Sequence, residues 1–399
     1  ASGLTDKRTH YGTLEIEPSD LKDKMDSGEN LYILDVRTPE EYETWKISYD
    51  KHLEPSLVPL DKLSSEEMIR NIPKDKEVIT VCSHGMRSKM AAEYLSQLGY
   101  DVKSIRGGMV AWNKINDLAL IPCLSDPNLK IWQIRRISKG CMTYLISYFN
   151  DAVVIDPPCS SVTSIFEIAK NNDLQIQALI ETHRHADHLS ASRTIAKETG
   201  AKLYLSPLEE YETEPSKING LDLNFLDDGK RIEISKGLSF DVIHTPGHTA
   251  GSMSIRLETL SEGGEPSKKE IFLFSGDTLF VDGIGRPDLH DRIDEFSRTL
   301  FLTYKKLSAL PDDAIVLPSH YSKSMKHKEP IFKTIRDIKA YVKAFRMDEN
   351  EFTSYVVSSI PPQPMNYRRI LRLNKDLLLC NILQLDDLEA GPNSCGIQS

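Results

Sequence analysis

Three histidines and an aspartate crowd together directly after the apolar run 176–180, which predicts a buried strand. Alternate side chains of an extended segment share a face, so we expect His183 and His185 to point the same way. Asp187 and His188 follow where the strand has to break into a turn. Neutral imidazole and carboxylate are the usual ligands of intermediate divalent metals. The sequence therefore predicts a metal site at the end of this strand.

The overall composition limits the classes of function that the chain can serve. Its 399 residues are enough for two domains with separate cores. The formal charge of −10 argues against nucleic-acid and anionic-membrane partners. No apolar stretch approaches the roughly 20 residues of a membrane span, and the polar segment 1–11 lacks the apolar core of a signal peptide. Six cysteines are too sparse for a disulfide framework, so we expect a reduced, cytoplasmic protein.

The first part of the chain alternates short apolar runs with helical patterns, which is typical of a small doubly wound α/β domain. Thr38 is placed to cap a helix that has Pro39 at its first position. We assign residues 1–118 to this domain, residues 119–129 to a linker and residues 130–399 to a second domain. The first domain's expected strands are 31–34, 78–81 and 102–105, and its expected helices are 18–27, 89–98 and one from Met109 onward.

Cys82 lies where a predicted strand meets the start of a helix. Backbone N–H groups converge at such a junction and the helix dipole favours an anion there. A cysteine in this position has a stabilised thiolate and becomes a nucleophile near neutral pH. Arg87 adds a positive charge, so we predict that Cys82 and Arg87 are catalytic. The other residues of this loop are Ser83, His84, Gly85, Met86 and Ser88.

Several motifs of the first domain together resemble a rhodanese domain. They are Asp-Val-Arg at 35–37, Glu-Glu-Tyr at 40–42, the loop 82–88 and the segment 106–112. The resemblance implies that the loop cysteine carries a persulfide sulfur, which passes between thiols, sulfite and cyanide. Four residues separate the loop's cysteine from its arginine, as in sulfurtransferases, whereas the related phosphatases have a loop one residue longer. We therefore expect sulfur transfer rather than phosphate hydrolysis.

In the second domain, three more candidate metal ligands follow predicted strands. His248 comes after a strand at 238–244, Asp277 after a strand at 271–275, and His320 after a strand at 314–316. With the first cluster they make seven candidate ligands at strand-to-loop transitions. Two sheets with helices outside them are the most economical packing for this region. Its other expected strands are 132–137, 143–148, 152–155, 178–181, 202–205, 231–234 and 252–257.

The second domain resembles the metallo-β-lactamase superfamily, which implies an αββα sandwich over residues 128–390. Finer motifs at 140–146, 285–288, 361–367 and 391–395 resemble the persulfide dioxygenase branch. The glyoxalase II thioesterases share the metal motifs, so these motifs do not distinguish the two branches.

The dioxygenase branch implies one Fe(II) per chain, held by His183, His248 and Asp277. Two imidazoles and a carboxylate leave open positions of the kind that oxygen-activating iron requires. The remaining candidates, His185, Asp187, His188 and His320, would then orient and tune these ligands. In the alternative, a thioesterase, the same seven residues bind two metals with Asp277 between them. The residue types alone do not choose between these arrangements.

The fusion of the two domains favours the dioxygenase, because a rhodanese makes or consumes persulfides and a thioesterase has no use for Cys82. We expect O₂-dependent oxidation of a low-molecular-weight thiol persulfide, with glutathione as the expected thiol, to sulfite and the free thiol. Sulfite and thiosulfate would be substrates of the rhodanese site. The resemblance also implies a homodimer. The candidates for substrate binding are Arg286, Tyr321 and Arg368.

Overall fold

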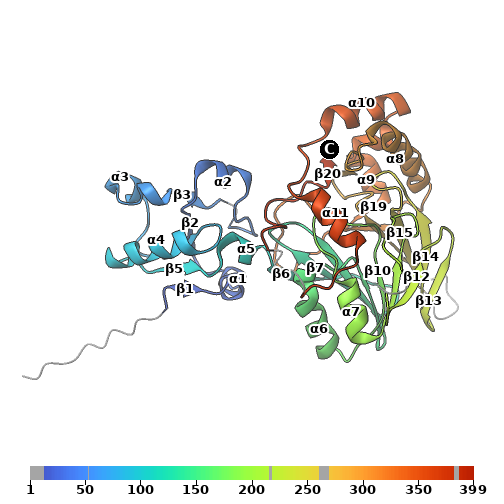
Figure 1. The fold of residues 1–399 in the computed structure, drawn as a ribbon, viewed down its shortest axis with the longest axis horizontal. Coiled ribbons are helices and arrows are strands. Elements are labelled where there is room, and N and C mark those ends of the chain that lie inside the picture. The colour runs from blue at the N-terminus through green and yellow to red at the C-terminus, as the bar shows by residue number, and fades with distance from the viewer. Residues whose placement is uncertain (1–12, 53, 215–217, 260–268, 382–385) are drawn as a thin grey trace, which may run out of the picture. The chain divides into compact units, whose positions relative to one another are not determined.

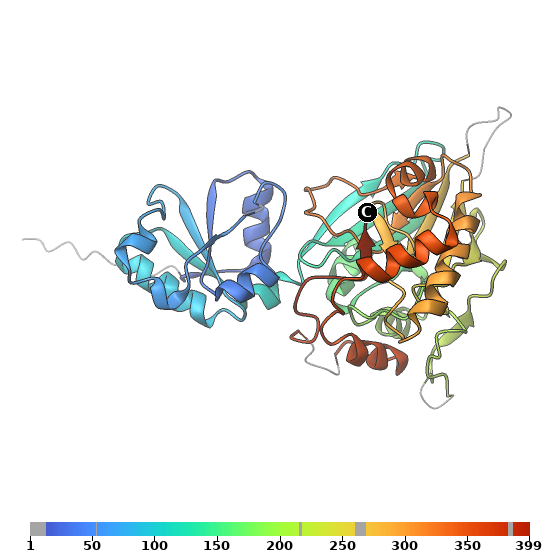
Figure 2. The same cartoon turned by 90° about the horizontal axis from the view of Figure 1, so that it is seen from above.

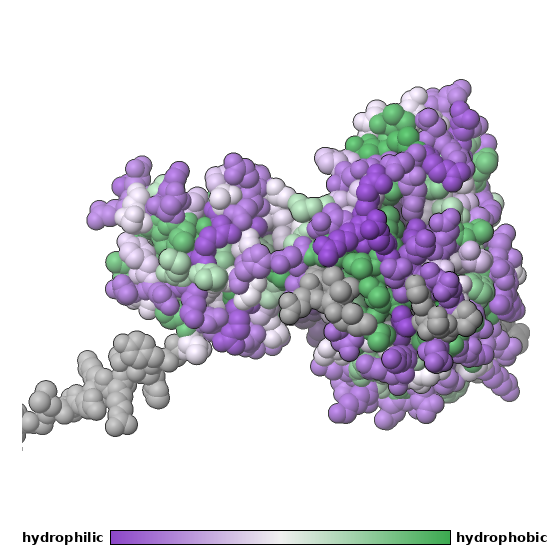
Figure 3. Space-filling model, in the orientation of Figure 1, coloured by the Kyte–Doolittle hydropathy of each residue, from purple (hydrophilic) through white to green (hydrophobic). Residues whose placement is uncertain are grey.

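The computed structural model describes residues 13–52, 54–214, 218–259, 269–381 and 386–399, and the chain divides between Ile115 and Asn116 into two compact units. The polar segment 1–11, where we expected no signal peptide, lies outside the described residues. Among the described residues, none of the helices has the length and apolar character that a membrane span requires. Hydrophilic residues cover most of the face of each unit that Figure 3 shows.

The first unit is built on a parallel sheet with the strand order β1-β5-β4-β2-β3 (Figures 1 and 2). Its core joins Val78 of the central strand to Ala91 and Leu95 of the helix that follows the cysteine loop. This confirms the predicted doubly wound domain. Its elements are β1 Glu15–Ile16, α1 Pro18–Asp26, β2 Leu31–Asp35, α2 Pro39–Thr44, β3 Ser56–Leu57, α3 Glu66–Ile69, β4 Glu77–Val81, α4 Met86–Gln97, β5 Val102–Ile105 and α5 Gly108–Trp112.

Local chemistry explains where α2 begins. The Thr38 side chain accepts a hydrogen bond from the backbone N–H of Glu41, and the Glu41 carboxylate accepts one from the backbone N–H of Thr38. This reciprocal capping box satisfies two N–H groups that the first turn of a helix leaves without partners. It confirms the cap predicted at Thr38, and it also fixes Glu41 beside the cysteine loop.

The second unit contains two larger sheets, with strand orders β12-β11-β10-β9-β8-β7-β6 and β13-β14-β15-β16-β18-β19. A further two-stranded sheet pairs β17 with β20. The strands are β6 Asn116–Ile121, β7 Leu129–Arg136, β8 Met142–Tyr148, β9 Asp151–Ile155, β10 Gln175–Ile180, β11 Lys202–Leu205, β12 Asp222–Phe225, β13 Arg231–Ser235, β14 Leu238–His244, β15 Met253–Glu258, β16 Ile271–Gly276, β17 Gly283–Gly285, β18 Ile315–Pro318, β19 Lys333–Thr334 and β20 Gly396–Gln398.

Helices cover the outer faces of the two large sheets (Figure 1). α6 and α7 pack on the first sheet, where Ile165 and Ile195 join one apolar cluster. α8, α9 and α10 pack on the second sheet, and Tyr144 meets Phe274 edge to face between the sheets, with ring centroids 5.2 Å apart. The predicted αββα sandwich is therefore confirmed. The helices are α6 Val162–Asn171, α7 Ser192–Thr199, α8 Ile293–Ser308, α9 Ile335–Tyr341, α10 Glu349–Ser359 and α11 Tyr367–Lys375.

The segment 119–129, which we expected to be a linker, contributes in part to the sandwich. β6 runs antiparallel to β7, with Asn116 opposite Arg136 and Ile121 opposite Ile131. The buried ion pair between Asp117 and Arg135 joins the same two strands. β6 is an edge strand with one face turned to solvent, so its alternating polar and apolar residues gave only a weak strand signal.

A disulfide joins Cys159, which follows β9, to Cys380, which follows α11. The sparse cysteines of the sequence predicted no framework of disulfides, and this single bridge was not anticipated. The two cysteines are 221 residues apart in the chain, so only the tertiary fold brings them together.

Candidate metal centre and cysteine loop

Three of the predicted ligands converge at one point of the second unit. His183 follows β10, His248 follows β14, and Asp277 comes directly after β16. Asp277 Oδ2 lies 3.3 Å from His183 Nε2 and 3.6 Å from His248 Nε2. All three side chains are buried, and their ligand atoms lie within 4.8 Å of one another. The strand ends thus assemble a three-residue cluster from distant parts of the sequence.

Hydrogen bonds fix which ring nitrogen of each histidine is free. The Thr182 hydroxyl donates to Asp156 Oδ2 at 2.6 Å, so it accepts from His183 Nδ1 at 3.0 Å and leaves His183 Nε2 with a lone pair. His248 Nδ1 donates to the Arg286 carbonyl at 2.7 Å. Burial lowers the pKa of His248 to about 3, so its ring is neutral at pH 7. Neutral imidazole is the form that binds metals.

The cluster fits a divalent transition metal. His183 Nε2 and Asp277 Oδ2 are buried polar atoms without a hydrogen-bond partner in the structure. Buried polar atoms in proteins are nearly always satisfied, and a bound cation is one way to satisfy them. Two neutral imidazoles and one carboxylate would compensate the charge of such a cation and leave coordination positions open.

His185 lies beside His183, with ring centroids 4.1 Å apart, but it is not one of the three residues that converge at Asp277. Its Nε2 lies 3.1 Å from Asp156 Oδ1 and 3.1 Å from Glu181 Oε2. β10 already ends at Ile180, so the strand alternation behind the expectation does not extend to these histidines. Burial disfavours the charged ring, but Asp156 and Glu181 outweigh it and raise the pKa of His185 well above its usual value.

The remaining predicted residues bind mainly one another. His320 Nε2 lies 2.9 Å from Asp187 Oδ2, and its Nδ1 makes a hydrogen bond with Asp277 Oδ1. His188 Nδ1 lies 2.9 Å from the same Asp187 oxygen. In this arrangement His320 bridges two carboxylates with both ring nitrogens, and Asp187 is engaged by two histidines.

Two buried thiols that the sequence did not single out flank this network. Cys141 Sγ donates to Asp187 Oδ2 at 3.0 Å, and Cys395 lies within 4.8 Å of ligand atoms of Asp187 and His320. Both belonged to motifs quoted above only for their resemblance to a family, and nothing local marked them as neighbours of the metal ligands. Cys395 also lines a cavity of about 430 Å³ together with His320, Tyr321 and Asn393.

The cysteine loop of the first unit has the geometry expected of an anion-binding loop, with backbone N–H groups directed at the Cys82 sulfur. Cys82 Sγ accepts hydrogen bonds from the backbone N–H groups of Gly85, at 3.1 Å, and Ser88, at 3.3 Å. The loop rests against Gly108, where a Cβ atom would lie 2.3 Å from the Cys82 carbonyl oxygen, so this position needs glycine. Such N–H groups would stabilise a thiolate or a persulfide on Cys82.

Arg87 is held by a partner that the sequence did not predict. Its guanidinium makes two hydrogen bonds to the Glu41 carboxylate, at 2.8 and 2.9 Å, and a third to the Ser83 hydroxyl at 3.2 Å. The bond from Arg87 lowers the pKa of Glu41, and Glu41 raises that of Arg87. The positive charge expected beside Cys82 is therefore largely compensated, and Glu41 is the additional residue of this site.

The three candidates for substrate binding differ in their surroundings. Arg286 is fully buried, and its guanidinium makes hydrogen bonds to protein atoms, so its role in substrate binding stays a prediction. Arg368 is exposed and pairs with Asp291 at 3.0 Å. Tyr321 is partly exposed and lines the cavity next to His320, so it is the candidate of the three that a ligand in this cavity would meet.

Comparison with known proteins agrees with this division of the chain. The rhodanese-like domain model matches residues 17–115, and the metallo-beta-lactamase superfamily model matches residues 139–320. An uncharacterized protein of Mycobacterium tuberculosis is 30% identical over 192 residues, which is 43% of this chain and 80% of that protein. The Bacillus subtilis protein YtwF, named provisionally as a sulfurtransferase, is 35% identical over 98 residues, 25% of this chain and 88% of its own length.

Other relatives of the second unit carry the name of a thioester hydrolase. Hydroxyacylglutathione hydrolase of Aeromonas salmonicida is 30% identical over 187 residues, 44% of this chain and 59% of the enzyme. A metallo-beta-lactamase from Staphylococcus aureus has 27% identity and a TM-score of 0.54, covering 62% of this chain and 72% of that one. ETHE1 from Myxococcus xanthus, at 24% identity and a TM-score of 0.50, covers 62% and 98% and shares the fold.

The second unit is thus an αββα sandwich with a candidate metal centre, and the first unit is a rhodanese-like α/β domain. The chain belongs to the metallo-beta-lactamase superfamily and carries a rhodanese-like domain ahead of the superfamily domain.

Proposed function

We propose that the second unit is a persulfide dioxygenase with one Fe(II) per chain, and that the first unit transfers sulfane sulfur on Cys82. The overall reaction would be RSSH + O₂ + H₂O → RSH + H₂SO₃, where RSH is a low-molecular-weight thiol and RSSH is its persulfide. Fe(II), when bound, would supply the activation of O₂ and a position for the persulfide sulfur. The sulfite released would be a sulfur acceptor for the rhodanese-like unit of the same chain.

One observation carries this proposal. His183, His248 and Asp277 turn ligand atoms to a common point, where His183 Nε2 and Asp277 Oδ2 have no hydrogen-bond partner. By contrast, His188 Nδ1 and His320 Nε2 both make hydrogen bonds with Asp187. A site with two metals would need these latter atoms as ligands. Two imidazoles and one carboxylate form the donor set of oxygen-activating mononuclear iron sites.

The surrounding residues would prepare the site for this chemistry. Asp156 accepts a hydrogen bond from the Thr182 hydroxyl, which leaves that hydroxyl to accept from His183 Nδ1 and keeps His183 Nε2 free to bind. The Arg286 carbonyl orients His248 in the same way. These contacts hold the ligands before substrate arrives, which lowers the cost of organising them for the reaction. Tyr321 and Cys395 border the cavity through which the carrier thiol would approach.

A thioesterase is the second candidate, because relatives at 30% identity are named hydroxyacylglutathione hydrolases. The two functions differ in metal content and in oxygen consumption. Protein isolated without oxygen should contain about one iron per chain, and it should take up O₂ and release sulfite when given glutathione persulfide. Two metal ions per chain, hydrolysis of a glutathione thioester, and no O₂ uptake after iron is supplied would refute the dioxygenase and support the thioesterase.

A further inference from the structure

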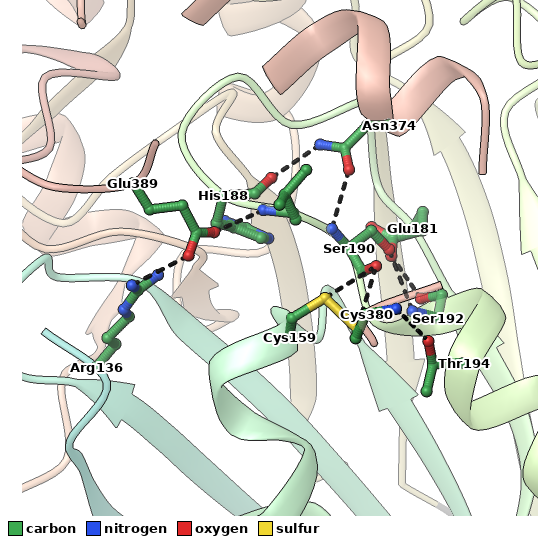
Figure 4. The surroundings of a disulfide bond; sticks show 11 residues. Arg136, Cys159, Glu181, His188, Ser190, Ser192, Thr194, Asn374, Cys380 and Glu389 are labelled. Carbon is green, nitrogen blue, oxygen red and sulfur yellow. Dashed lines mark hydrogen bonds and ion pairs between the residues drawn. A yellow bond between two sulfur atoms is a disulfide. The ribbon is translucent and has the colours of Figure 1, made fainter. Parts of the chain in front are cut away.

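The disulfide between Cys159 and Cys380 lies beside Ser190 (Figure 4). Ser190 ends the loop 183–190, which carries the proposed ligand His183 and is called the metal loop below. The backbone N–H of Cys159 donates to the carbonyl of Leu189 at 2.9 Å, and Pro158 forms a β-bridge with Ser190. Both contacts reach the residues that immediately follow His188. One sulfur of the disulfide is therefore anchored to the downstream end of the metal loop.

The other end of the disulfide belongs to the segment after α11, and α11 holds the same loop through Asn374. The Asn374 side chain is buried and donates to the carbonyls of His185, at 2.9 Å, and His188, at 2.8 Å. Its Oδ1 accepts from the Ser190 N–H at 2.9 Å. Figure 4 shows Asn374 and the disulfide on the two sides of Ser190. Asn374 is thus a positioning residue for the backbone of the loop that follows the proposed ligand His183.

A small molecule can reach the disulfide. Both cysteines are partly exposed and border a cavity of about 460 Å³, whose wall includes Thr194, Lys197 and Asn381. The carbonyl oxygen of Ser190 lies 3.6 Å from Cys159 Sγ and 3.9 Å from Cys380 Sγ, so either thiol would have an acceptor after reduction. The site can accommodate both redox states of the pair.

We propose that Cys159 and Cys380 form a thiol-exchange switch that controls how firmly the metal loop is held. A low-molecular-weight thiolate RS⁻ attacks one sulfur, the bond between the cysteines breaks, and the other cysteine leaves with the electron pair. A second RS⁻ then forms RSSR and releases the first cysteine. The net reaction is 2 RSH + Cys–S–S–Cys → RSSR + 2 Cys–SH, so the external thiol is oxidised and the protein gains two electrons and two protons.

Opening the disulfide loosens the loop without freeing it. Cys380 keeps the hydrogen bond from its N–H to the Thr194 hydroxyl at 2.9 Å, and Leu377 stays in the apolar core. Reduction removes the covalent link between Cys380, which follows α11, and Cys159, which follows β9. Asn374 of α11 is then held less firmly. Couplings of this kind are typically about 5- to 150-fold, and the retained contacts place this one near the lower end.

The test is metal release from the holoprotein, with and without prior reduction by dithiothreitol, into an excess of a chromogenic chelator. We expect release at least about fivefold faster after reduction. Alkylation followed by peptide mass spectrometry should label Cys159 and Cys380 only in the reduced sample. Equal release rates, alkylation of both cysteines before reduction, or unfolding of the second unit on reduction, seen by circular dichroism, would each overturn the proposal.

Three variants locate the effect. Cys159→Ser/Cys380→Ser should release metal fast in both conditions. Asn374→Ala should also release fast, and reduction should then add little, because the coupling passes through Asn374. Cys123→Ser removes a free cysteine outside the metal cluster and should respond to dithiothreitol like the parent protein. A full redox response in Asn374→Ala would refute the coupling.

The switch rests on the proposed function, because it would regulate the same metal site. Its assay measures metal release and does not depend on the reaction at that site. Metal release is measured for the metal that the isolated protein holds, identified by elemental analysis. A protein that holds zinc and hydrolyses thioesters would refute the dioxygenase and still test the switch. Conversely, if the protein holds iron and releases it at the same rate before and after reduction of the disulfide, the switch is refuted and the dioxygenase proposal is unaffected.

Discussion

Arg286 offers a direct test of whether it stabilises the fold or binds substrate. Its guanidinium makes two hydrogen bonds to the Asp288 carboxylate, at 2.7 and 2.9 Å. Three more reach the carbonyls of Pro361, Pro362 and Ser394, at 2.7, 3.0 and 2.9 Å. One buried cation therefore ties three segments of the second unit together, two of them from the C-terminal part of the chain.

The Arg286→Ala change should lower the free energy of unfolding of the second unit by about 3–5 kcal/mol. Removing one partner of a buried ion pair typically costs this much, because the remaining charge is left without compensation. The three carbonyls lose their donors as well, and each unsatisfied buried group costs about 1–3 kcal/mol unless water reaches it. The Asp288 side chain is 11% exposed, so water can partly hydrate its carboxylate in the variant. The loss of stability therefore stays near about 3–5 kcal/mol and does not reach the sum of the separate costs.

Arg368→Ala is the matched control, because this arginine pairs with Asp291 at a site where both side chains are 64% exposed. Such pairs contribute about 0–1 kcal/mol. Urea unfolding can be followed by the fluorescence of Trp132, which is buried in the second unit, in proteins whose Trp45 and Trp112 are replaced by phenylalanine. If Arg286→Ala unfolded within about 1 kcal/mol of its parent while KM for the persulfide rose strongly, Arg286 would be a substrate ligand after all.

Three further predictions concern the two sites. His183→Ala should leave the protein essentially without iron, whereas Asp187→Ala should keep about one iron at saturating metal and lose about 10- to 100-fold in O₂ uptake; equal metal loss in elemental analysis would favour the two-metal thioesterase. Cys82→Ser should abolish sulfur transfer from thiosulfate, because its hydroxyl is not ionised near pH 7, while O₂ uptake with added glutathione persulfide persists; joint loss in a folded variant would contradict separate sites. Glu41→Gln should lower KM for the thiosulfate anion by up to about fivefold, since the charge of Arg87 is no longer compensated, and a raised KM in steady-state kinetics would exclude this electrostatic role.

Much of the secondary structure was predictable because its causes are local. The strands at 202–205 and 238–244 have the predicted bounds, and Thr38 caps its helix as its residue type suggests. Strands with weak local patterns were missed. β6 alternates on a solvent-facing edge, and β20 is only three residues long and finds its partner at Gly283–Gly285.

For the sites, the sequence determined the chemistry of the residues, and the tertiary structure decided which of them meet. Histidine and aspartate at strand ends predicted a metal site, because strands of one sandwich bring their ends to common edges. His185 lies beside His183, but the direction in which its ring nitrogens point depended on where β10 ends, and a local pattern does not fix that point to within a residue. The orientation of His185 then followed from Asp156 and Glu181.

The contacts between distant segments could be seen only in the folded chain. Arg286 looked like a surface cation until the carbonyls of the C-terminal segments enclosed it. Cys159 and Cys380 are 221 residues apart, and neither lies in a motif that announces a partner. Sequence composition determines which groups are available, but burial and pairing depend on packing between elements that are remote in the chain, and these decide whether an arginine binds a ligand or stabilises the fold.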